Sequence, residues 1–195
     1  MTSGALVPAR GRSAQPALTW PVAPIVDEEL VLRAWTIRDA PELARAWSDP
    51  VIAARLPVPD ERHRDAAADW ISGWESRRRS GAALDLVVAD AAGDAVLGEV
   101  GFGRIDQERR AAVVGWWIAA SARRAGIGAR AVGLATGWAL TEVGLAAVVA
   151  EIDSDNVASI RLAESVGFEL GTAPGPAGRR VYVRRRPRPA RSGGR

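Results

Sequence analysis

Residues 121–130 have the sequence SARRAGIGAR, which joins an apolar run at 111–119 to a stretch with helical periodicity. Gly126 and Gly128 allow the backbone to turn tightly and to approach a ligand, because neither carries a Cβ. The first N–H groups of the following helix are unpaired and lie at the positive end of its dipole, so the turn suits an anion such as pyrophosphate. Arg123 and Arg124 can add charge-assisted hydrogen bonds to phosphate oxygens.

The turn differs from two common phosphate-binding patterns. The Walker pattern requires Gly-Lys-Ser/Thr, and the chain contains no lysine. The Rossmann fingerprint requires a third glycine at the position of Arg130 or Ala131. A Gly-x-Gly pair taken alone is equally compatible with an ordinary strand-to-helix turn, so its meaning depends on the segments around it.

The segments on both sides of the turn predict a mixed α/β fold. Apolar, β-branched runs predict strands, and apolar residues at helical spacing predict helices. The expected strands are 30–35, 84–89, 96–103, 111–119, 145–152 and a strand from 168 onward that pairs with 181–183; the expected helices are 39–49, 65–79, 126–143 and 156–166. The resulting order is β-α-α-β-β-β-α-β-α-β-β, with an antiparallel meander in its centre and helices flanking a mostly antiparallel sheet.

Charge is distributed unevenly along the 195 residues. All 26 basic residues are arginine, and with 23 acids they give a net charge of +3 and a pI near 10.7, which first suggests a nucleic-acid-binding protein. Every acid, however, lies between Asp27 and Glu169, and only 16 arginines lie in that part, so residues 27–170 carry a net charge of −7. An acidic body argues against a nucleic-acid surface and favours a cationic partner.

The residue types exclude several chemistries. Cysteine is absent, so the chain has no disulfide, no thiolate nucleophile and no thiolate zinc site. His63 is the single histidine, which excludes a metal site built from several histidines, and we expect no metal.

The chain is expected to form one domain, at 27–184, with two flexible ends. Residues 1–26 contain four prolines and no helical period, which predicts a flexible leader. Residues 185–195 predict a disordered Arg/Pro-rich tail, with an RNA-binding arm as the alternative. The sequence shows neither a signal peptide nor an uninterrupted transmembrane stretch, so we expect a cytoplasmic protein.

Three short motifs follow one another in the second half of the chain. They are Gly115-Trp116-Trp117-Ile118, then Arg123-x-x-Gly126-x-Gly128, then Asn156-Val157-Ala158-Ser159 followed by Gly167-Phe168. The second motif matches Gln/Arg-x-x-Gly-x-Gly/Ala, the signature of the GNAT superfamily of acetyl-CoA-dependent N-acetyltransferases, which the chain resembles over 28–184. The first and third are similar to the Gly-Tyr-Trp-Leu and Asn-x-x-Ser … Gly-Phe segments of the branch containing the ribosomal-protein N-terminal (alanine/serine) acetyltransferases.

The resemblance implies a direct transfer, in which acetyl-CoA and an amine bind together, the neutral amine attacks the thioester carbonyl, and coenzyme A leaves. The absence of cysteine agrees, because no acyl-enzyme thioester can form. The strand 113–119 would splay from the next strand and offer backbone groups to the pantetheine arm, with the N–H near Trp117 or Ile118 as the oxyanion donor. The residues expected to hold the pyrophosphate are Arg123, Arg124, Ala125, Gly126, Ile127, Gly128 and Ala129.

Asn156 and Ser159 are three residues apart at the start of a helix and can face the same ligand. By family analogy Asn156 would contact the pantetheine arm, and Ser159 would donate a proton or a hydrogen bond to the departing thiolate. The alternative is a capping arrangement, with Asp155 or Asn156 as the N-cap.

The general base differs from that of the relatives. Many members of this branch have a glutamate two residues before the Gly of Gly-Tyr-Trp, and this chain has Val113 there. Glu99 is the first candidate, acting through water on the ammonium group, with Asp106 and Glu151 behind it. An outward-facing strand carboxylate is the alternative for Glu99.

We therefore expect an acyltransferase that acetylates a primary amine, either a protein or peptide N-terminus or a small cationic amine. The acidic body would attract such an acceptor. A non-catalytic acyl-CoA-binding or interaction module with the same fold is the alternative, consistent with Val113. A nucleic-acid-associated protein that acts through its basic tail is a further alternative, and a homodimer is compatible with the family.

Overall fold

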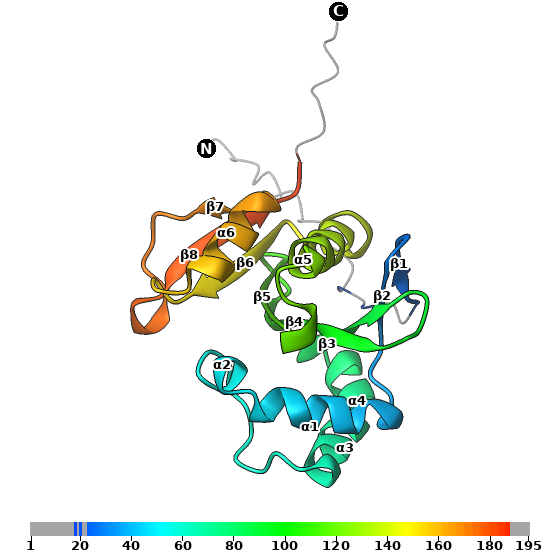
Figure 1. The fold of residues 1–195 in the computed structure, drawn as a ribbon. Helices are drawn as coiled ribbons and strands as arrows, with labels where there is room; N and C mark the ends of the chain where they lie inside the picture. The colour runs from blue at the N-terminus through cyan, green and yellow to red at the C-terminus, as the bar shows by residue number, and fades with distance from the viewer. Residues whose placement is uncertain (1–17, 19, 21–22, 188–195) are drawn as a thin grey trace, which may run out of the picture.

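The computed structural model describes residues 18, 20 and 23–187 of the chain (Figure 1). Its sheet has eight strands in the order β1-β2-β3-β4-β5-β6-β8-β7. The strands are β1 (Ile25–Val26), β2 (Leu30–Arg33), β3 (Ala83–Asp90), β4 (Val96–Asp106), β5 (Ala111–Ile118), β6 (Ala147–Ile152), β7 (Glu169–Leu170) and β8 (Arg180–Arg185). The helices are α1 (Ala40–Ser48), α2 (Pro50–Ala53), α3 (Arg64–Ser72), α4 (Trp74–Arg79), α5 (Ile127–Trp138) and α6 (Val157–Ser165), with short turns η1 (Ile37–Asp39), η2 (Ala120–Ala122), η3 (Ala139–Val143) and η4 (Pro176–Gly178).

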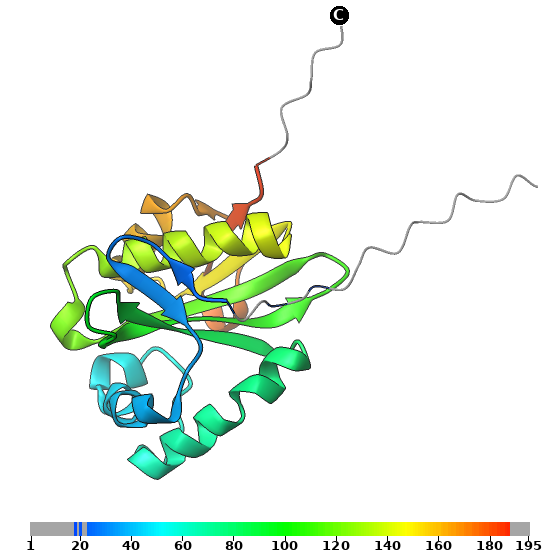
Figure 2. The same ribbon diagram turned by 90° about the vertical axis from the view of Figure 1, so that its right-hand side faces the viewer.

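Helices cover both faces of the sheet. Figure 2 shows α5 over one face and α1, α3 and α4 against the other. The alternation of β4 divides its side chains between these layers. Phe102 packs under α5, where it stacks on Trp20 at 5.5 Å, whereas Glu99 faces the layer of α1, α3 and α4. Each face therefore has its own chemistry, apolar on the α5 side and partly polar on the other.

The sheet confirms the predicted mixed, mostly antiparallel architecture. β3, β4 and β5 form the expected antiparallel meander, and β5 and β6 are its parallel pair. The strand expected from residue 168 onward is β7, which pairs with β8 through Leu170 and Tyr182. Local hydrophobic patterning was sufficient to predict these strands and helices, because buried strands and amphipathic helices have different periods.

The helices differ from the expectation in three places. The predicted helix 65–79 is divided at Gly73 into α3 and α4, and Arg77 donates a 2.9 Å hydrogen bond back to the Trp70 carbonyl at this break. The predicted helix 126–143 ends in the π-helical turn η3. α2 was not expected; Asp49 caps it by accepting from the N–H of Val51. In the described part of the chain, no helix has both the length and the apolarity to cross a membrane.

The described residues near the N-terminus differ from the predicted flexible leader. Ile25–Val26 form β1, and the buried Trp20 accepts a hydrogen bond from Arg78 through its carbonyl oxygen. Most of 1–26, and positions 188–195 of the predicted tail, lie outside the described residues. At the other end, β8 continues to Arg185.

Candidate active site

The parallel strands β5 and β6 separate after a short register. Pairing runs from Ala111 with Ala147 to Val113 with Val149, and it stops there although β5 continues to Ile118. The backbone groups of β5 beyond Val113 that face β6 therefore have no strand partner. This is the splay that the family resemblance implied.

The direction of the N–H groups along β5 follows from one hydrogen bond. The Ala119 N–H donates to the carbonyl of Leu97, a residue of β4, at 2.8 Å. Because backbone groups alternate in direction along a strand, the Trp117 N–H faces β4 and the Ile118 N–H faces the opening between β5 and β6. The Ile118 carbonyl accepts from Arg123 Nε at 2.9 Å, which agrees with this direction. Of the two expected oxyanion donors, Ile118 is the one turned toward the opening.

A cavity of about 670 Å³ extends from this opening to the Gly-rich turn. We call it the large cavity. It is bordered by α2, the end of β5, the turn before α5 and the start of α6, and its lining includes Val51, Ile52, Arg55, Leu56, Trp116, Trp117, Ile118, Arg123, Arg124, Gly126, Gly128, Ala129, Asn156, Ser159 and Leu162. The three sequence motifs thus meet around one space.

Gly126 and Gly128 are each favoured over other residues for a different structural reason. Gly126 is the N-cap of α5 and has φ of +79°, a left-handed conformation that favours glycine. Gly128 has helical geometry, but a Cβ there would lie 2.8 Å from Leu162 Cδ1 and 3.3 Å from Ile118 Cγ1. Gly126 therefore makes the turn, and Gly128 allows α5 to lie close to α6 and β5. Ala125, also expected at the phosphate, lies in this turn, and Ile127, expected there too, is the first residue of α5.

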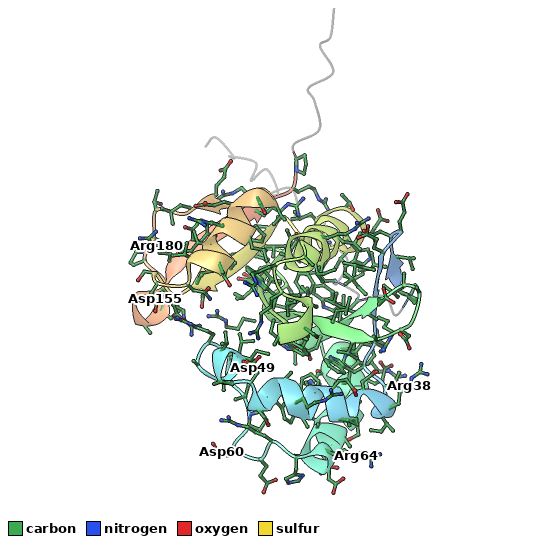
Figure 3. The ribbon with its side chains drawn as sticks, in the orientation of Figure 1. Arg38, Asp49, Asp60, Arg64, Asp155 and Arg180 are labelled. Carbon is green, nitrogen blue, oxygen red and sulfur yellow. The ribbon has the colours of Figure 1, made fainter. Side chains whose placement is uncertain are left out.

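The two arginines of the turn are placed differently. Arg123 lines the large cavity, but its Nη2 donates to Asp49 Oδ2 at 2.6 Å and its Nε bonds the Ile118 carbonyl. The expected ligand Arg123 is therefore already engaged, and it ties the turn to the N-cap of α2. Arg124 is exposed at the cavity and has φ of +66°. Figure 3 shows Asp49 beside the gap that separates α2 from the α5 and α6 layer.

Asn156 and Ser159 lie at the start of α6, and the capping alternative is present. Asn156 Oδ1 accepts from the Ser159 N–H at 3.2 Å, so Asn156 is the N-cap of the helix. Both residues also line the large cavity. The cap uses only the oxygen of the Asn156 amide and the backbone of Ser159, so it leaves the amide NH₂ and the Ser159 hydroxyl available at the cavity.

A second cavity, of about 310 Å³, lies under α1 and α3 on the face of β3, β4 and β5. We call it the small cavity. It shares Ile52, Leu56, Trp116 and Trp117 with the large cavity, so the two spaces adjoin at the splayed end of β5. Trp117 is buried and Trp116 is half-buried. Both tryptophans of the β5 motif thus stand where the cavities meet.

Glu99 lines the small cavity opposite Trp117 in the β4–β5 register. Its Oε2 accepts from Trp35 Nε1 at 3.0 Å. Burial, together with the nearby Asp85 carboxylate, raises the pKa of Glu99 to about 8, and the indole N–H groups of Trp35 and Trp117 oppose this rise. A carboxyl group with such a pKa gains and loses a proton near neutral pH, as a general base must.

Asp85 is a second carboxyl group in the small cavity. It lies across from Gly101, and a Cβ built there would be 2.9 Å from Asp85 Oδ1 and 3.9 Å from Glu99 Oε1. Burial raises the pKa of Asp85, and the positive charge of Arg77 opposes the rise. Arg77 Nε is 3.5 Å from Asp85 Oδ2, and its guanidinium lies 4.0 Å over the ring of Trp70. The charge of Asp85 is thus partly balanced by Arg77, whereas no basic residue in the described part of the chain lies within ion-pair distance of Glu99.

The other two base candidates are already paired. Asp106, at the end of β4, accepts from the N–H and from Nη1 of Arg109. Glu151 pairs with Arg104 Nη2 at 2.5 Å and faces the splay. Val113 lines the small cavity, on the same face of the sheet as Glu99. A carboxylate on β4 thus reaches the cavity that a carboxylate at position 113 would also reach.

Sequence reasoning missed the contributions of α2 and of Trp35. Arg55, just after α2, pairs with Asp155 at 2.6 Å and with Asp153 at 3.3 Å, so this segment crosses one side of the large cavity. The Asp49-Pro50 pair, an N-cap followed by proline, was the available signal for α2. Nothing local marks Trp35, because its partner Glu99 is 64 residues away.

Comparison with known proteins agrees with this geometry. The family described as acetyltransferase (GNAT) domain matches residues 29–169. An uncharacterized N-acetyltransferase, p20 of Bacillus licheniformis, is 28% identical over 142 residues, which are 73% of this chain and 80% of p20.

Solved structures share the fold at low sequence identity. RimJ of Mycobacterium smegmatis, solved with CoA-disulfide, has a TM-score of 0.69 at 21% identity, and the match covers 79% of each chain. The ribosomal-protein-S5-alanine acetyltransferase of Vibrio fischeri has a TM-score of 0.72 at 16% identity over 84% of this chain and 97% of the other. These neighbours confirm the predicted mixed, helix-flanked sheet.

Proposed function

The chain belongs to the GNAT acetyltransferase family, and we propose that it transfers an acetyl group from acetyl-CoA directly to the nitrogen of a primary amine. The observation that carries this proposal is the meeting of two cavities at Trp116 and Trp117. The large cavity has the features that acetyl-CoA needs, and the small cavity holds a carboxyl group suited to an amine. The acceptor is a protein or peptide N-terminus or a small cationic amine.

The residues of the large cavity fit acetyl-CoA. The unpaired backbone groups of β5 beyond Val113 suit the amide groups of a pantetheine arm, and the N-terminus of α5 at Gly126 suits its pyrophosphate. Exposed Arg124 adds a positive charge at the same end. When bound, acetyl-CoA supplies the acetyl group as a thioester, which an amine can attack without an enzyme nucleophile.

Glu99 is the proposed base. An amine arrives as an ammonium group, and Glu99 in its carboxylate form takes one proton from it, directly or through one water. The free amine then attacks the thioester carbonyl carbon, a C–N bond forms, and the C–S bond breaks. The nitrogen gives up a second proton to solvent.

Two groups at the large cavity assist this step. The Ile118 N–H, turned toward the opening, donates a hydrogen bond to the carbonyl oxygen as negative charge develops there. The Ser159 hydroxyl donates its proton to the departing sulfur and regains one from solvent. Asn156 holds the first turn of α6, and with it Ser159, through its cap.

Charge supports a cationic acceptor. Residues 27–170 carry a net charge of −7, so the protein attracts a positively charged amine over distances of about a Debye length, roughly 8 Å at physiological salt. The position of Glu99 favours a catalytic role over a binding module that has lost its base, because a carboxyl group with a pKa of about 8 stands in the small cavity.

The proposal is tested by measuring thiol release from acetyl-CoA with a panel of primary amines and peptides. Binding of coenzyme A itself is measured in parallel by calorimetry. Amine-dependent thiol release that Glu99→Gln lowers at least 100-fold supports the proposal. Coenzyme A binding without turnover on any acceptor supports the binding-module alternative, and failure to bind coenzyme A overturns both.

A further inference from the structure

The floor of the small cavity is built from glycine. Gly101 and Gly103 alternate with residues of the opposite face along β4, and Gly115 stands directly across from Gly101 on β5. All three line the small cavity. Strand interiors favour β-branched and aromatic residues, and a glycine there marks a bend or the close approach of another group.

Space is the reason for these glycines. Every glycine with a positive φ in the described part of the chain lies elsewhere, so the backbone does not require glycine at 101, 103 or 115. A Cβ at Gly103 or at Gly115 would meet no heavy atom within 4 Å. Larger side chains at Gly103 and Gly115 would fit the sheet and would fill the cavity. Glycine at these positions keeps the cavity open.

The walls of the small cavity are aromatic and rigid. Trp47, Trp70 and Trp117 line it together with the aliphatic side chains of Ile52 and Leu56. The Trp70 ring is held edge-on by Trp35 and by Trp47, each with a centroid distance of 6.2 Å. The wall of the small cavity is therefore preorganised for a flat or bulky apolar group.

Charge in the small cavity is suited to one ammonium group. Glu99 lies on the face of the floor, two residues before Gly101, and Asp85 is already opposed by Arg77. Arg104 follows the floor at its other end and lines the cavity, and its Nη2 pairs with Glu151 at 2.5 Å. Asp85 and Arg104 thus each have a partner of opposite charge, which leaves Glu99 as the carboxyl group that an ammonium group would meet.

We propose that the acceptor is a small primary amine carried on an apolar, ring-sized group, with the ring on the floor of Gly101, Gly103 and Gly115 and the nitrogen facing Glu99. The inference rests on the proposed acetyl transfer and specifies its acceptor. The apolar group leaves water for the tryptophan-lined cavity, and this burial supplies binding energy that a short polar amine lacks.

The test compares kcat/KM of the wild-type protein for 2-phenylethylamine, ethylamine, putrescine and a peptide that begins with alanine. We expect 2-phenylethylamine to exceed each of the others by at least about tenfold. Gly103→Val and Gly115→Val fill the floor, and each is expected to lower the value for 2-phenylethylamine at least about tenfold more than the value for ethylamine. Gly137→Ala is the matched control, since an added methyl there also meets nothing within 4 Å and Gly137 lines neither cavity.

The outcomes separate the two proposals. Turnover of the peptide, putrescine or ethylamine without a preference for the ring overturns this inference and leaves the acetyl transfer standing. Equal loss for both amines in the glycine variants also overturns it. If a valine variant does not fold by circular dichroism, the wild-type series still decides. Failure to bind coenzyme A overturns the acetyl transfer itself.

Discussion

Trp35 Nε1 donates a 3.0 Å hydrogen bond to Glu99 Oε2, across 64 residues of chain. Trp35 follows β2, and Glu99 lies in the first half of β4. The bond orients the carboxyl group in the small cavity and favours its charged form, whereas burial and Asp85 favour the neutral form. The balance leaves the pKa of Glu99 at about 8, where the group can act as a base.

The rate of acetyl transfer is expected to rise with pH up to about 8. Below its pKa, Glu99 is protonated and cannot take a proton from the acceptor, so kcat/KM should increase about tenfold per pH unit until Glu99 ionises near pH 8. Steady-state kinetics from pH 5.5 to 9.5 measure the profile. In Glu99→Gln the break near pH 8 should disappear, because the rate then follows the free fraction of the acceptor amine, which keeps rising up to about pH 10. A break that stays near pH 8 in Glu99→Gln would assign it to another group.

The same substitution has a predictable effect on stability. The pKa of Glu99 is higher in the folded state, about 8, than its ordinary value of 4.5, so its contribution to stability is present below about pH 4.5 and is lost as pH rises through about 8. Urea unfolding at pH 5 and pH 9 should therefore show that Glu99→Gln gains stability relative to wild type at the higher pH. Equal differences at both values would contradict the raised pKa.

Two neighbouring substitutions should move the pH profile in opposite directions. Trp35→Phe keeps an aromatic ring at this position but removes the indole N–H that stabilises the Glu99 carboxylate. The pKa of Glu99 should therefore rise further. Asp85→Asn removes a negative charge beside Glu99, so the pKa should fall. Profiles of kcat/KM measure both shifts. A purely structural role would lower the rates without these opposite displacements, and shifts in one common direction would refute the electrostatic account.

Ser159→Ala is expected to lower kcat by about 100-fold and to leave the KM for acetyl-CoA nearly unchanged. The hydroxyl would act on the departing sulfur, and the cap of α6 uses only the backbone N–H of Ser159. Ser165→Ala is a matched control in the last turn of α6, where that hydroxyl bonds the Leu162 carbonyl. An unchanged kcat in Ser159→Ala would remove Ser159 from the acid role.

Asn156 has two roles that two substitutions can separate. Asn156→Ala removes the N-cap of α6 and should cost about 1 kcal/mol of stability. Asn156 lines the large cavity, and Asn156→Asp keeps a capping oxygen but loses the amide NH₂. We expect Asn156→Asp to match wild type in thermal unfolding and to raise the KM for acetyl-CoA. Wild-type kinetics in Asn156→Asp would leave Asn156 as a cap alone.

Arg124→Ala is expected to raise the KM for acetyl-CoA about tenfold with little change in kcat. Arg124 is exposed at the large cavity, where it can bond a phosphate oxygen. Arg38→Ala is the matched control, because Arg38 is an exposed arginine at the opposite end of α1 from Asp49 (Figure 3). The effect should weaken as salt rises, and an Arg38→Ala effect of equal size would point to overall charge instead.

Most of the fold could be predicted from local patterning. The alternating strands of the meander and the helical periods of α5 and α6 are properties of neighbouring residues, so the sequence was enough to order them. β1 and α2 could not be predicted from local patterning, because each is too short to show a period. The same holds for the breaks in the longer helices, where Arg77 bonds the Trp70 carbonyl across Gly73.

The sequence by itself determined the family motifs, the Gly-rich turn before α5 and the choice of Glu99 over its alternatives as first base candidate. Only the tertiary structure decided the surroundings of those residues: Arg123 bonded to Asp49, Asn156 used as a cap, and Trp35 brought to Glu99. The physical reason is that a pKa, an ion pair or a cavity depends on groups that are distant in the chain. Local periodicity predicts which face of a strand or helix is buried, but it does not predict which residues that face will contact.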